Sequence, residues 1–203
     1  MRIAFSQQTK RHFPPAVMWL KPLQPTEAAT FLPHGHYTLT QKDRTFIPHL
    51  LVVPVGALVL FPNKDPFFHN VFSLFDGKRF DLGLYEAGSA KGVTFSREGI
   101  SYIFCNIHPE MSAVVVALST PFYAVADAKG NFQLSAVPEG NYELHVWIEG
   151  IPQPDLDHLR RTIHLSPETR DLGVVKLSAV PKLPATHLNE FGQPYAPNPQ
   201  TSY

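Results

Sequence analysis

The sequence contains a single cysteine, no excess of charge of either sign and no long apolar segment. One cysteine excludes an intrachain disulfide, so the role of this thiol must be explained by its neighbours. Seventeen basic residues balance seventeen acidic ones, so the chain lacks the electrostatic field that attracts nucleic acids or anionic membranes. No run reaches the about 18 apolar residues that a transmembrane helix requires. We therefore expect no nucleic-acid partner and no membrane span.

Turn-forming residues are frequent and divide the hydrophobic sequence into short pieces. The chain has 20 Pro and 12 Gly among 44% hydrophobic residues, and short Val, Leu and Phe runs lie between them. This pattern is typical of strands broken by turns rather than of helices. We predict an all-β fold, and 203 residues are enough for two domains.

Three potential ligands for a soft metal lie within one short stretch, residues 105–111 (CNIHPEM). Cys105 supplies a thiolate, His108 an imidazole and Met111 a thioether. Copper held by one cysteine and two histidines, with a weak axial methionine, is the arrangement that carries single electrons. The second histidine must come from another part of the chain, and the stretch 62–72 (PNKDPFFHNVF) supplies His69.

These two stretches together resemble the cupredoxins, in which a His-Asn pair precedes a strand and a Cys-His-Met loop joins the last two strands. The C-x2-H-x2-M spacing is similar to the short loop of amicyanin rather than to the longer loop of plastocyanin. Runs such as FPN, HNVFS and CNIH resemble cupredoxin-domain proteins labelled methylamine-utilisation proteins, and the resemblance covers roughly residues 37–150. It implies a Greek-key β-sandwich with one type 1 copper ion, whose ligands are His69, Cys105, His108 and, axially, Met111.

The same resemblance implies roles for residues next to the ligands. The Asn70 amide donates to the thiolate and its side chain ties the two ligand loops together, with a plain turn-forming Asn as the alternative. Ile107 occupies a position that is proline in plastocyanin, so its backbone N–H remains as a second donor for the sulfur. An apolar docking patch formed by Phe67, Phe68 and Pro109 is expected around the ring of His108. The alternative is that these three side chains pack in the core.

Each candidate ligand also has an ordinary structural explanation. A lone cysteine is often an inert buried residue and a methionine near a loop end often only packs, but the joint spacing favours ligands. His34 and His36 form either a second metal site or an exposed linker, and we prefer the linker because no Cys, Asp or Glu is near. We assign no role to the remaining histidines, which are His12, His49, His145, His158, His164 and His187.

A second β-rich pattern follows the predicted copper domain. Strand-like runs from 122 to 147, joined by Gly-bearing turns, resemble the transthyretin-like domain of carboxypeptidase regulatory regions without its first strand. Residues 16–20 (AVMWL) fit that strand, so the cupredoxin is expected to be inserted into the second sandwich. The predicted divisions are a first strand and linker in 1–34, the cupredoxin in 35–118, the remaining transthyretin-like domain in 119–180 and a Pro-rich tail in 181–203.

These patterns predict a monomeric electron carrier that exchanges electrons with a redox protein. No Ser-His-Asp set, phosphate loop or carboxylate pair is convincing, so we expect no catalytic activity. Copper delivery or storage and a non-redox interaction scaffold are the alternative functions. The first residues lack the apolar centre of a signal peptide. Because cupredoxins of this type are usually exported, we expect a periplasmic or otherwise exported protein whose signal has been removed, with a cytoplasmic protein as the alternative.

Overall fold

The computed structural model describes residues 1–5, 13–25, 31–74, 77–169, 171–178, 181–182 and 187–195. Within these ranges the regular elements are strands, apart from one five-residue helix. The predicted all-β class is therefore confirmed. His12 and parts of the predicted linker and Pro-rich tail lie outside the described residues.

The chain forms two compact units, each assembled from separate parts of the sequence. Unit 1 comprises Met1–Thr30 and Thr120–Leu183, and unit 2 comprises Phe31–Ser119 and Pro184–Tyr203. The change from unit 2 to unit 1 lies next to the predicted boundary at 118. The identities assigned to the domains, including a transthyretin-like unit 1, stay predictions.

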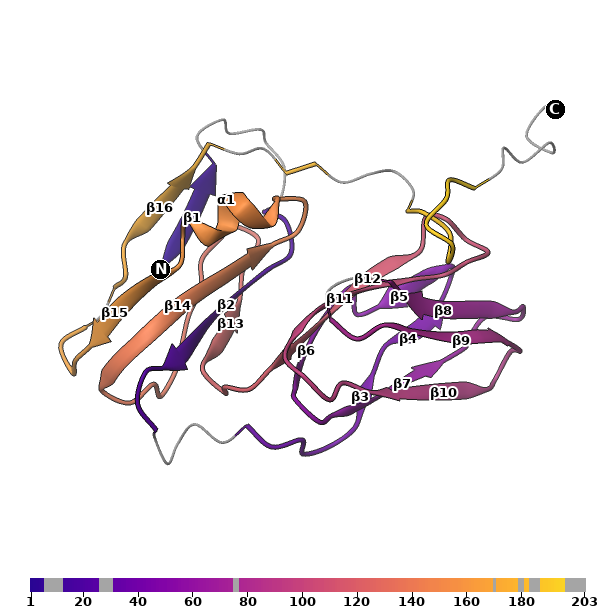
Figure 1. Cartoon of the computed structure of the whole chain (residues 1–203), viewed down its shortest axis with the longest axis horizontal. Coiled ribbons are helices and arrows are strands. Elements are labelled where there is room, and N and C mark those ends of the chain that lie inside the picture. The colour runs from indigo at the N-terminus through magenta and orange to yellow at the C-terminus, as the bar shows by residue number, and fades with distance from the viewer. Residues whose placement is uncertain are drawn as a thin grey trace. The chain divides into compact units, whose positions relative to one another are not determined.

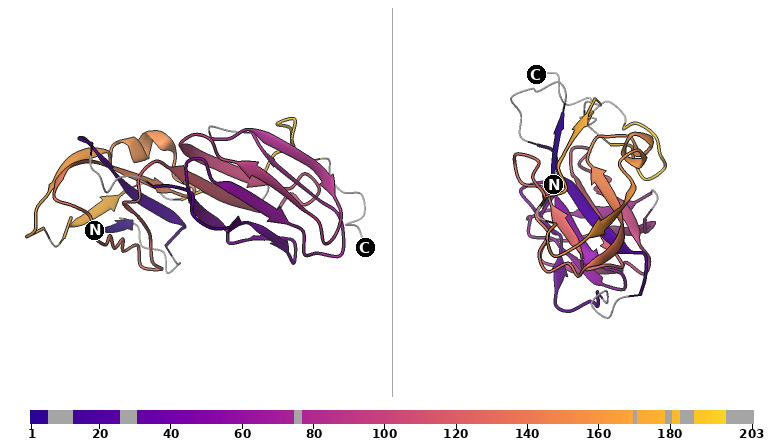
Figure 2. Two further views of the ribbon diagram at one scale, coloured as in Figure 1. Left: turned by 90° about the horizontal axis from the view of Figure 1, so that it is seen from below. Right: turned by 90° about the vertical axis from the view of Figure 1, so that its left-hand side faces the viewer.

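Unit 2 contains two main sheets, which Figures 1 and 2 show from different sides. The larger sheet has the strand order β6-β12-β11-β8-β9, the smaller one has the order β10-β7-β3, and β4 and β5 form a separate hairpin. The strands are β3 (Tyr37–Thr38), β4 (Thr40–Lys42), β5 (Thr45–Ile47), β6 (Leu50–Pro54), β7 (Leu58–Pro62), β8 (His69–Ser73), β9 (Phe80–Tyr85), β10 (Ala90–Thr94), β11 (Gly99–Phe104) and β12 (Ser112–Leu118). Most neighbours are antiparallel, while β6 runs parallel to β12 and β3 parallel to β7.

The core of unit 2 follows from the two-residue period of its strands. In β7, Val59 and Phe61 are fully buried while Leu58 is half exposed, because successive side chains point to opposite faces. Full burial of one such side chain contributes about 1.5–3 kcal/mol. The same hydrophobic cluster includes Cys105 and Met111. Two of the candidate ligands therefore belong to the hydrophobic core of the unit.

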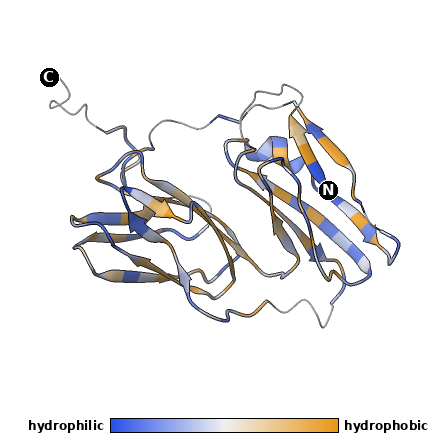
Figure 3. Ribbon diagram, turned by 180° about the vertical axis from the view of Figure 1, so that it is seen from behind, coloured by the Kyte–Doolittle hydropathy of each residue, from blue (hydrophilic) through white to orange (hydrophobic). Residues whose placement is uncertain are grey.

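Unit 1 is organised around β2 (Ala16–Pro22), a strand without a partner close in sequence. It pairs antiparallel with β13 (Tyr123–Val125) on one side and with β14 (Gly140–Ile148) on the other, so its partners lie more than 100 residues away, as expected. Hydrophobic and hydrophilic residues are interspersed along these strands (Figure 3). The other elements are β1 (Arg2–Phe5), the helix α1 (Gln153–Asp157), β15 (Arg161–Leu165) and β16 (Val174–Leu177).

Two features of unit 1 were not predicted from the sequence. β1 and β16 pair in parallel, and the short helix α1 buries Leu156. Proline at the start of α1 is compatible with its helical conformation, because the first helical N–H groups have no partner within the helix. In the part of the chain that the structure describes, no helix is long and apolar enough to cross a membrane.

Candidate metal centre

The ligand loop, residues 105–111, joins two strands that pair along their whole length. β11 ends at Phe104 and β12 begins at Ser112, and these two residues lie opposite each other in the antiparallel register. On its other side, β11 pairs with β8 through Phe104 and Phe72. The start of β8, where His69 lies, is therefore at the same end of the sheet as the ligand loop.

Three side chains converge at this end of the sheet. His69, Cys105 and His108 have donor atoms within 4.8 Å of one another, and no other such group of three was found among the described residues. The sulfur of Cys105 is 3.6 Å from Nδ1 of His69 and 3.6 Å from Nδ1 of His108. Both imidazoles thus turn the same nitrogen towards the sulfur.

The two distances from the sulfur to a ring nitrogen fit ligands of a single metal ion. Imidazole nitrogen and thiolate sulfur lie about 2.0 and 2.3 Å from a first-row metal such as zinc. One nitrogen and one sulfur at a tetrahedral or trigonal angle are then about 3.5–3.7 Å apart. The observed distances of 3.6 Å agree with this value. One thiolate with two imidazoles is a donor set that suits copper.

The far nitrogen of His69 is held by a buried carboxylate. Nε2 lies 2.8 Å from Oδ2 of Asp65, and the two side chains are 0% and 5% exposed. A carboxylate can only accept here, so Nε2 carries the proton and Nδ1 presents a lone pair towards the sulfur. Such a partner fixes the orientation of a ligand imidazole and raises its basicity.

Asp65 is itself held by the tip of the β4–β5 hairpin. The backbone N–H groups of Asp43 and Arg44 donate to its two oxygens at 2.6 and 3.0 Å. Both hairpin residues have φ near +54°, as type I′ turns require. Burial is the largest influence on the pKa of Asp65 and raises it, but the hydrogen bonds from Arg44, His69 and Asp43 together hold it below the usual value. Asp65 is therefore ionised at neutral pH.

The sulfur of Cys105 is fully buried and surrounded by backbone donors. Burial raises the pKa of the thiol, while the N–H groups of Asn70, Ile107 and His108 lower it by a smaller amount. The net pKa is raised, so the metal-free chain holds a thiol at neutral pH. A bound cation reverses this balance, because coordination removes the thiol proton.

The ring of His108 lies against aromatic neighbours on the more open side of the centre. Its centroid is 4.8 Å from that of His69 and 5.6 Å from that of Phe67. Its pKa is lowered, first by burial and then by the nearby His69. Ile107, which precedes His108, is 46% exposed, and Phe68 is 55% exposed. Charged groups also lie near the ring, because Glu110 and Arg44 influence the pKa of His108.

The remaining predicted residues take different positions. Met111 is buried and its N–H donates to the carbonyl of His108 at 2.9 Å, which closes the turn at the end of the ligand loop. Asn70 accepts a hydrogen bond from the N–H of Asn106 at 3.3 Å, so its side chain links β8 to the ligand loop. Pro109 is partly buried, and its carbonyl accepts from the N–H of His187 at 3.2 Å.

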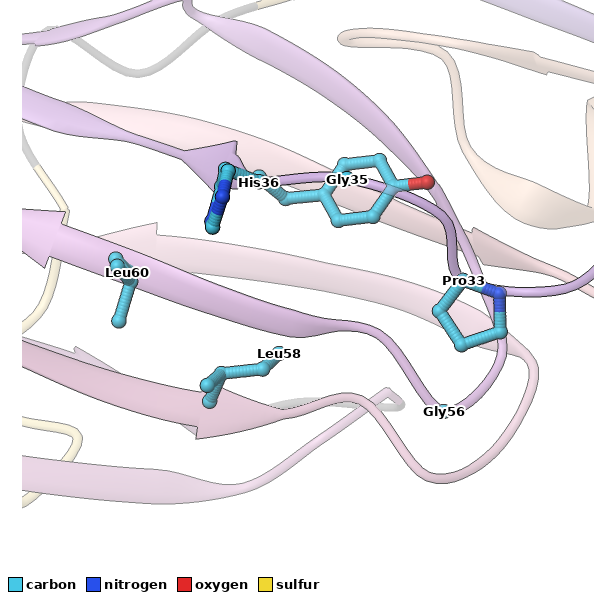
Figure 4. Close-up of a pocket in the computed structure, with 7 residues that line it drawn as sticks. Pro33, Gly35, His36, Gly56, Leu58 and Leu60 are labelled. Carbon is cyan, nitrogen blue, oxygen red and sulfur yellow. The ribbon is translucent and has the colours of Figure 1, made fainter.

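His34 and His36 do not join the three-residue cluster. The carbonyl of His34 accepts a hydrogen bond from the hydroxyl of Tyr37. His36 lines a pocket that Figure 4 shows, and no thiol or carboxylate lines it; the other lining residues are Pro33, Gly35, Tyr37, Gly56, Leu58 and Leu60. Among the described residues that line this pocket, His36 and Tyr37 carry the polar side chains, and His36 does not belong to a group of three potential metal ligands.

Sequence reasoning missed three residues next to the centre. Asp65 stands four residues before His69. Its place in the polar start of the stretch 62–72 was the sequence signal that could have identified it as a partner of His69. His187 received no role and Tyr195 was not considered, yet His187 stacks on Phe104 and the Tyr195 hydroxyl donates to the carbonyl of Cys105. No local pattern marks these two, because His187 lies 76 residues and Tyr195 lies 84 residues after the end of the ligand loop.

No family model matches the chain, and no curated protein sequence matches it. Solved structures that are similar to it include a copper-containing nitrite reductase from Thermus scotoductus SA-01, with 24% identity over 48% of this chain and a TM-score of 0.40. A purple cupredoxin from Nitrosopumilus maritimus has 23% identity over 40% of this chain and a TM-score of 0.37. A reduced amicyanin mutant has 20% identity over 50% of this chain and a TM-score of 0.39. The matches cover 25%, 99% and 98% of those three chains, so this chain spans a quarter of the nitrite reductase.

Proposed function

We propose that this protein is a cupredoxin, a type 1 copper protein that carries single electrons between redox partners. The observation that supports this most is the convergence of two imidazoles on one buried thiol, with Nδ1 of each ring 3.6 Å from the sulfur. Copper bound there supplies a one-electron couple between Cu(I) and Cu(II). In this proposal His69, Cys105 and His108 hold the metal, and Met111 is the axial ligand.

The surroundings of the ligands favour electron transfer over chemistry on a bound substrate. The carboxylate of Asp65 fixes His69, and the side chain of Asn70 ties the ligand loop to β8. Ligands held in this way stay in place when the charge of the centre changes. A small change in geometry between the two oxidation states keeps the barrier to electron transfer low.

The ring of His108 is the proposed route for electrons to a partner. It is the partly exposed member of the ligand set. The exposed side chain of Ile107 precedes it in the ligand loop, and the exposed side chain of Phe68 precedes the other ligand histidine, His69. Phe67 and Pro109 complete the proposed docking patch. An apolar patch of this kind suits a redox protein that binds briefly through a matching apolar surface.

Export to the periplasm and a monomeric state are part of the same proposal. Cell fractionation and light scattering of the purified protein test these two points. Recovery of the protein in the cytoplasmic fraction would contradict export, and a stable dimer would contradict the monomeric state.

Copper loading of the purified chain tests the proposed function. We expect one bound copper per chain and an intense visible band on addition of Cu(II), because thiolate-to-copper charge transfer requires a short bond to Cys105. Copper that binds without an intense band, and only as Cu(I), would favour delivery or storage. Absence of bound copper would favour a non-redox interaction scaffold.

A further inference from the structure

The described part of the C-terminal segment, residues 187–195, belongs to unit 2 and lies against the ligand loop. Although it follows all of the strands of unit 1 in sequence, it contacts residues of unit 2. Some of these contacts are with Phe72 and Asp81. The others are with Cys105, with the residues that flank it, and with Pro109, which follows His108.

One group of contacts reaches the start of the ligand loop. The hydroxyl of Tyr195 lies 3.3 Å from the carbonyl oxygen of Cys105 and 3.4 Å from Oδ1 of Asn106. The N–H of Glu190 donates to the same Oδ1 at 3.2 Å. Burial is the largest cause that raises the pKa of Tyr195 to about 12, so its hydroxyl remains a donor at neutral pH. The Asn106 side chain therefore joins the segment to the loop.

A second group of contacts centres on His187. Its ring stacks on that of Phe104 with centroids 4.4 Å apart and lies 5.8 Å from that of Phe72. Its N–H donates to the carbonyl of Pro109 at 3.2 Å. Phe104 immediately precedes Cys105, so the segment contacts the loop on both sides of the ligands Cys105 and His108.

We propose that residues 187–195 form a clasp that positions the ligand loop, with Tyr195 and His187 as its positioning residues. The clasp rests on the proposed function, because it sets the direction from which the Cys105 sulfur approaches the copper. The carbonyl of Cys105 is the backbone group next to the ligand side chain. Tyr195 fixes this carbonyl, and His187 fixes the ring of Phe104. Together these two contacts restrict rotation of the backbone at Cys105.

The clasp explains why the loop has partners beyond its own turn. A seven-residue connection between two strands has several conformations of similar energy, and ordering each residue has an entropic cost. Hydrogen bonds from the segment select one conformation, and each contributes roughly 1 kcal/mol. A ligand that is already in position binds metal without that ordering cost.

The test uses the full chain with four substitutions. Tyr195→Phe removes the hydroxyl and keeps the ring, and His187→Ala removes the stacked ring. Phe191→Ala is the matched control, because Phe191 is in the same segment and 78% exposed. His187→Phe, which retains a ring on Phe104, tests for rescue of the His187→Ala effect.

The first measurement is amide hydrogen exchange of the ligand loop in the metal-free protein. We expect about fivefold faster exchange in Tyr195→Phe, the factor that corresponds to the loss of one hydrogen bond of roughly 1 kcal/mol. His187→Ala should exchange faster by at least as much, and His187→Phe should restore most of the protection. A twofold change in exchange rate lies within the spread of measured hydrogen-bond contributions. Loop exchange within about twofold of the parent in both Tyr195→Phe and His187→Ala would therefore overturn the clasp.

The second measurement is made on the copper-loaded protein. We expect the visible band and the reduction potential to shift in Tyr195→Phe and His187→Ala and to stay unchanged in Phe191→Ala. Faster loop exchange with an unmoved band and potential would also overturn the proposal, because the segment would then only stabilise the fold. If the chain binds no copper, the proposed function fails, while the exchange measurement still decides whether the segment holds the loop.

Discussion

The two histidines of the candidate centre are held in different ways. His69 is fully buried, and its outer nitrogen is bound by Asp65, which is held in turn by two backbone N–H groups of the β4–β5 hairpin. His108 is partly exposed and stands on a loop beside Ile107, which is 46% exposed. One imidazole is thus fixed by two successive sets of hydrogen bonds, whereas the position of the other depends on the conformation of the ligand loop.

This difference assigns different tasks to the two sides of the centre. The His69 side, Asp65 and His69, provides a ligand whose position does not change. The ligand loop provides the sulfur, the second imidazole and the partly exposed ring through which, in the proposed function, a redox partner gains access. A centre that must be both rigid and accessible can be built by separating these requirements between two elements.

Replacement of Cys105 removes the sulfur that both imidazoles face, so it should have the largest effect. Cys105→Ser is expected to abolish the visible band completely, since an alcohol is too weakly acidic and too hard to replace a thiolate on copper. Circular dichroism should show an intact β fold. Optical spectra of the copper-treated variant check this prediction, and a retained band would contradict the ligand assignment.

Removal of each imidazole in turn compares the two sides directly. In His108→Gly the lost ring leaves an opening on the exposed side, so added imidazole is expected to restore the visible band. In His69→Gly the vacated position is sealed, because the native side chain is 0% exposed, and imidazole should not restore the band. Titration of both variants with imidazole makes this measurement. Equal rescue of the two variants would mean that the His69 side is as open as the loop.

Neutralising Asp65 weakens the His69 side without removing a ligand. Asp65→Asn keeps an acceptor for Nε2 of His69 but removes the charge, and loss of such a partner typically lowers metal affinity by about 10–100-fold. Cu(II) should lose more affinity than Cu(I), so the reduction potential is expected to rise. Competition with a chelator measures the affinity. Glu86→Gln, which removes an exposed charge from unit 2, is the control and should bind copper like the parent.

Met111→Leu tests a smaller contribution from the ligand loop. The variant is expected to keep copper and to shift the reduction potential upward, because an axial thioether tunes the metal rather than holding it. Leucine is similar in volume, so the buried position should still be filled. Voltammetry and metal analysis together check this, and complete loss of copper would show that Met111 is required to hold the metal.

The pH dependence of stability should reveal the cost of protonating the ligand loop. The pKa of His108 in the folded, metal-free chain is below its ordinary value of 6.5, mainly through burial. Between the folded and unfolded pKa values the unfolded chain therefore binds more protons, and stability falls as the pH decreases below about 6.5. Urea unfolding of the metal-free protein at several pH values measures the slope.

His108→Gln should make that slope shallower, whereas His34→Gln, at an exposed position, should leave it unchanged. An identical slope in His108→Gln and the parent would show that the pKa of His108 is not lowered by folding. Of the five predicted effects this is the smallest, because the ring is only partly buried.

The parts of this architecture that could be predicted from the sequence are those encoded over short distances. The spacing of Cys105, His108 and Met111 is local, and so is the alternation that predicts strands. The outlying strand at residues 16–20 was found because its apolar run had no neighbour. Asp65 was missed because its role depends on the fold of a hairpin 20 residues away.

His187 and Tyr195 show the limit more clearly. Their contacts to the ligand loop span 78–90 residues of sequence, counted from Pro109 to His187 and from Cys105 to Tyr195. Such contacts form only after the chain has passed through unit 1. Neither the composition nor the hydrophobic periodicity of the sequence predicts where the chain returns. The parallel pairing of β1 with β16 escaped prediction for the same reason, because it joins the two ends of unit 1.

The late position of the clasp also has a consequence for the order in which the protein is made. Tyr195 follows Asn106 by 89 residues, a delay of roughly 4–18 s at synthesis rates of 5–20 residues per second. For most of this interval the whole ligand set has been translated, but residues 187–195 have not. Each newly made chain therefore passes through a stage in which the ligand loop lacks its contacts with Tyr195 and His187.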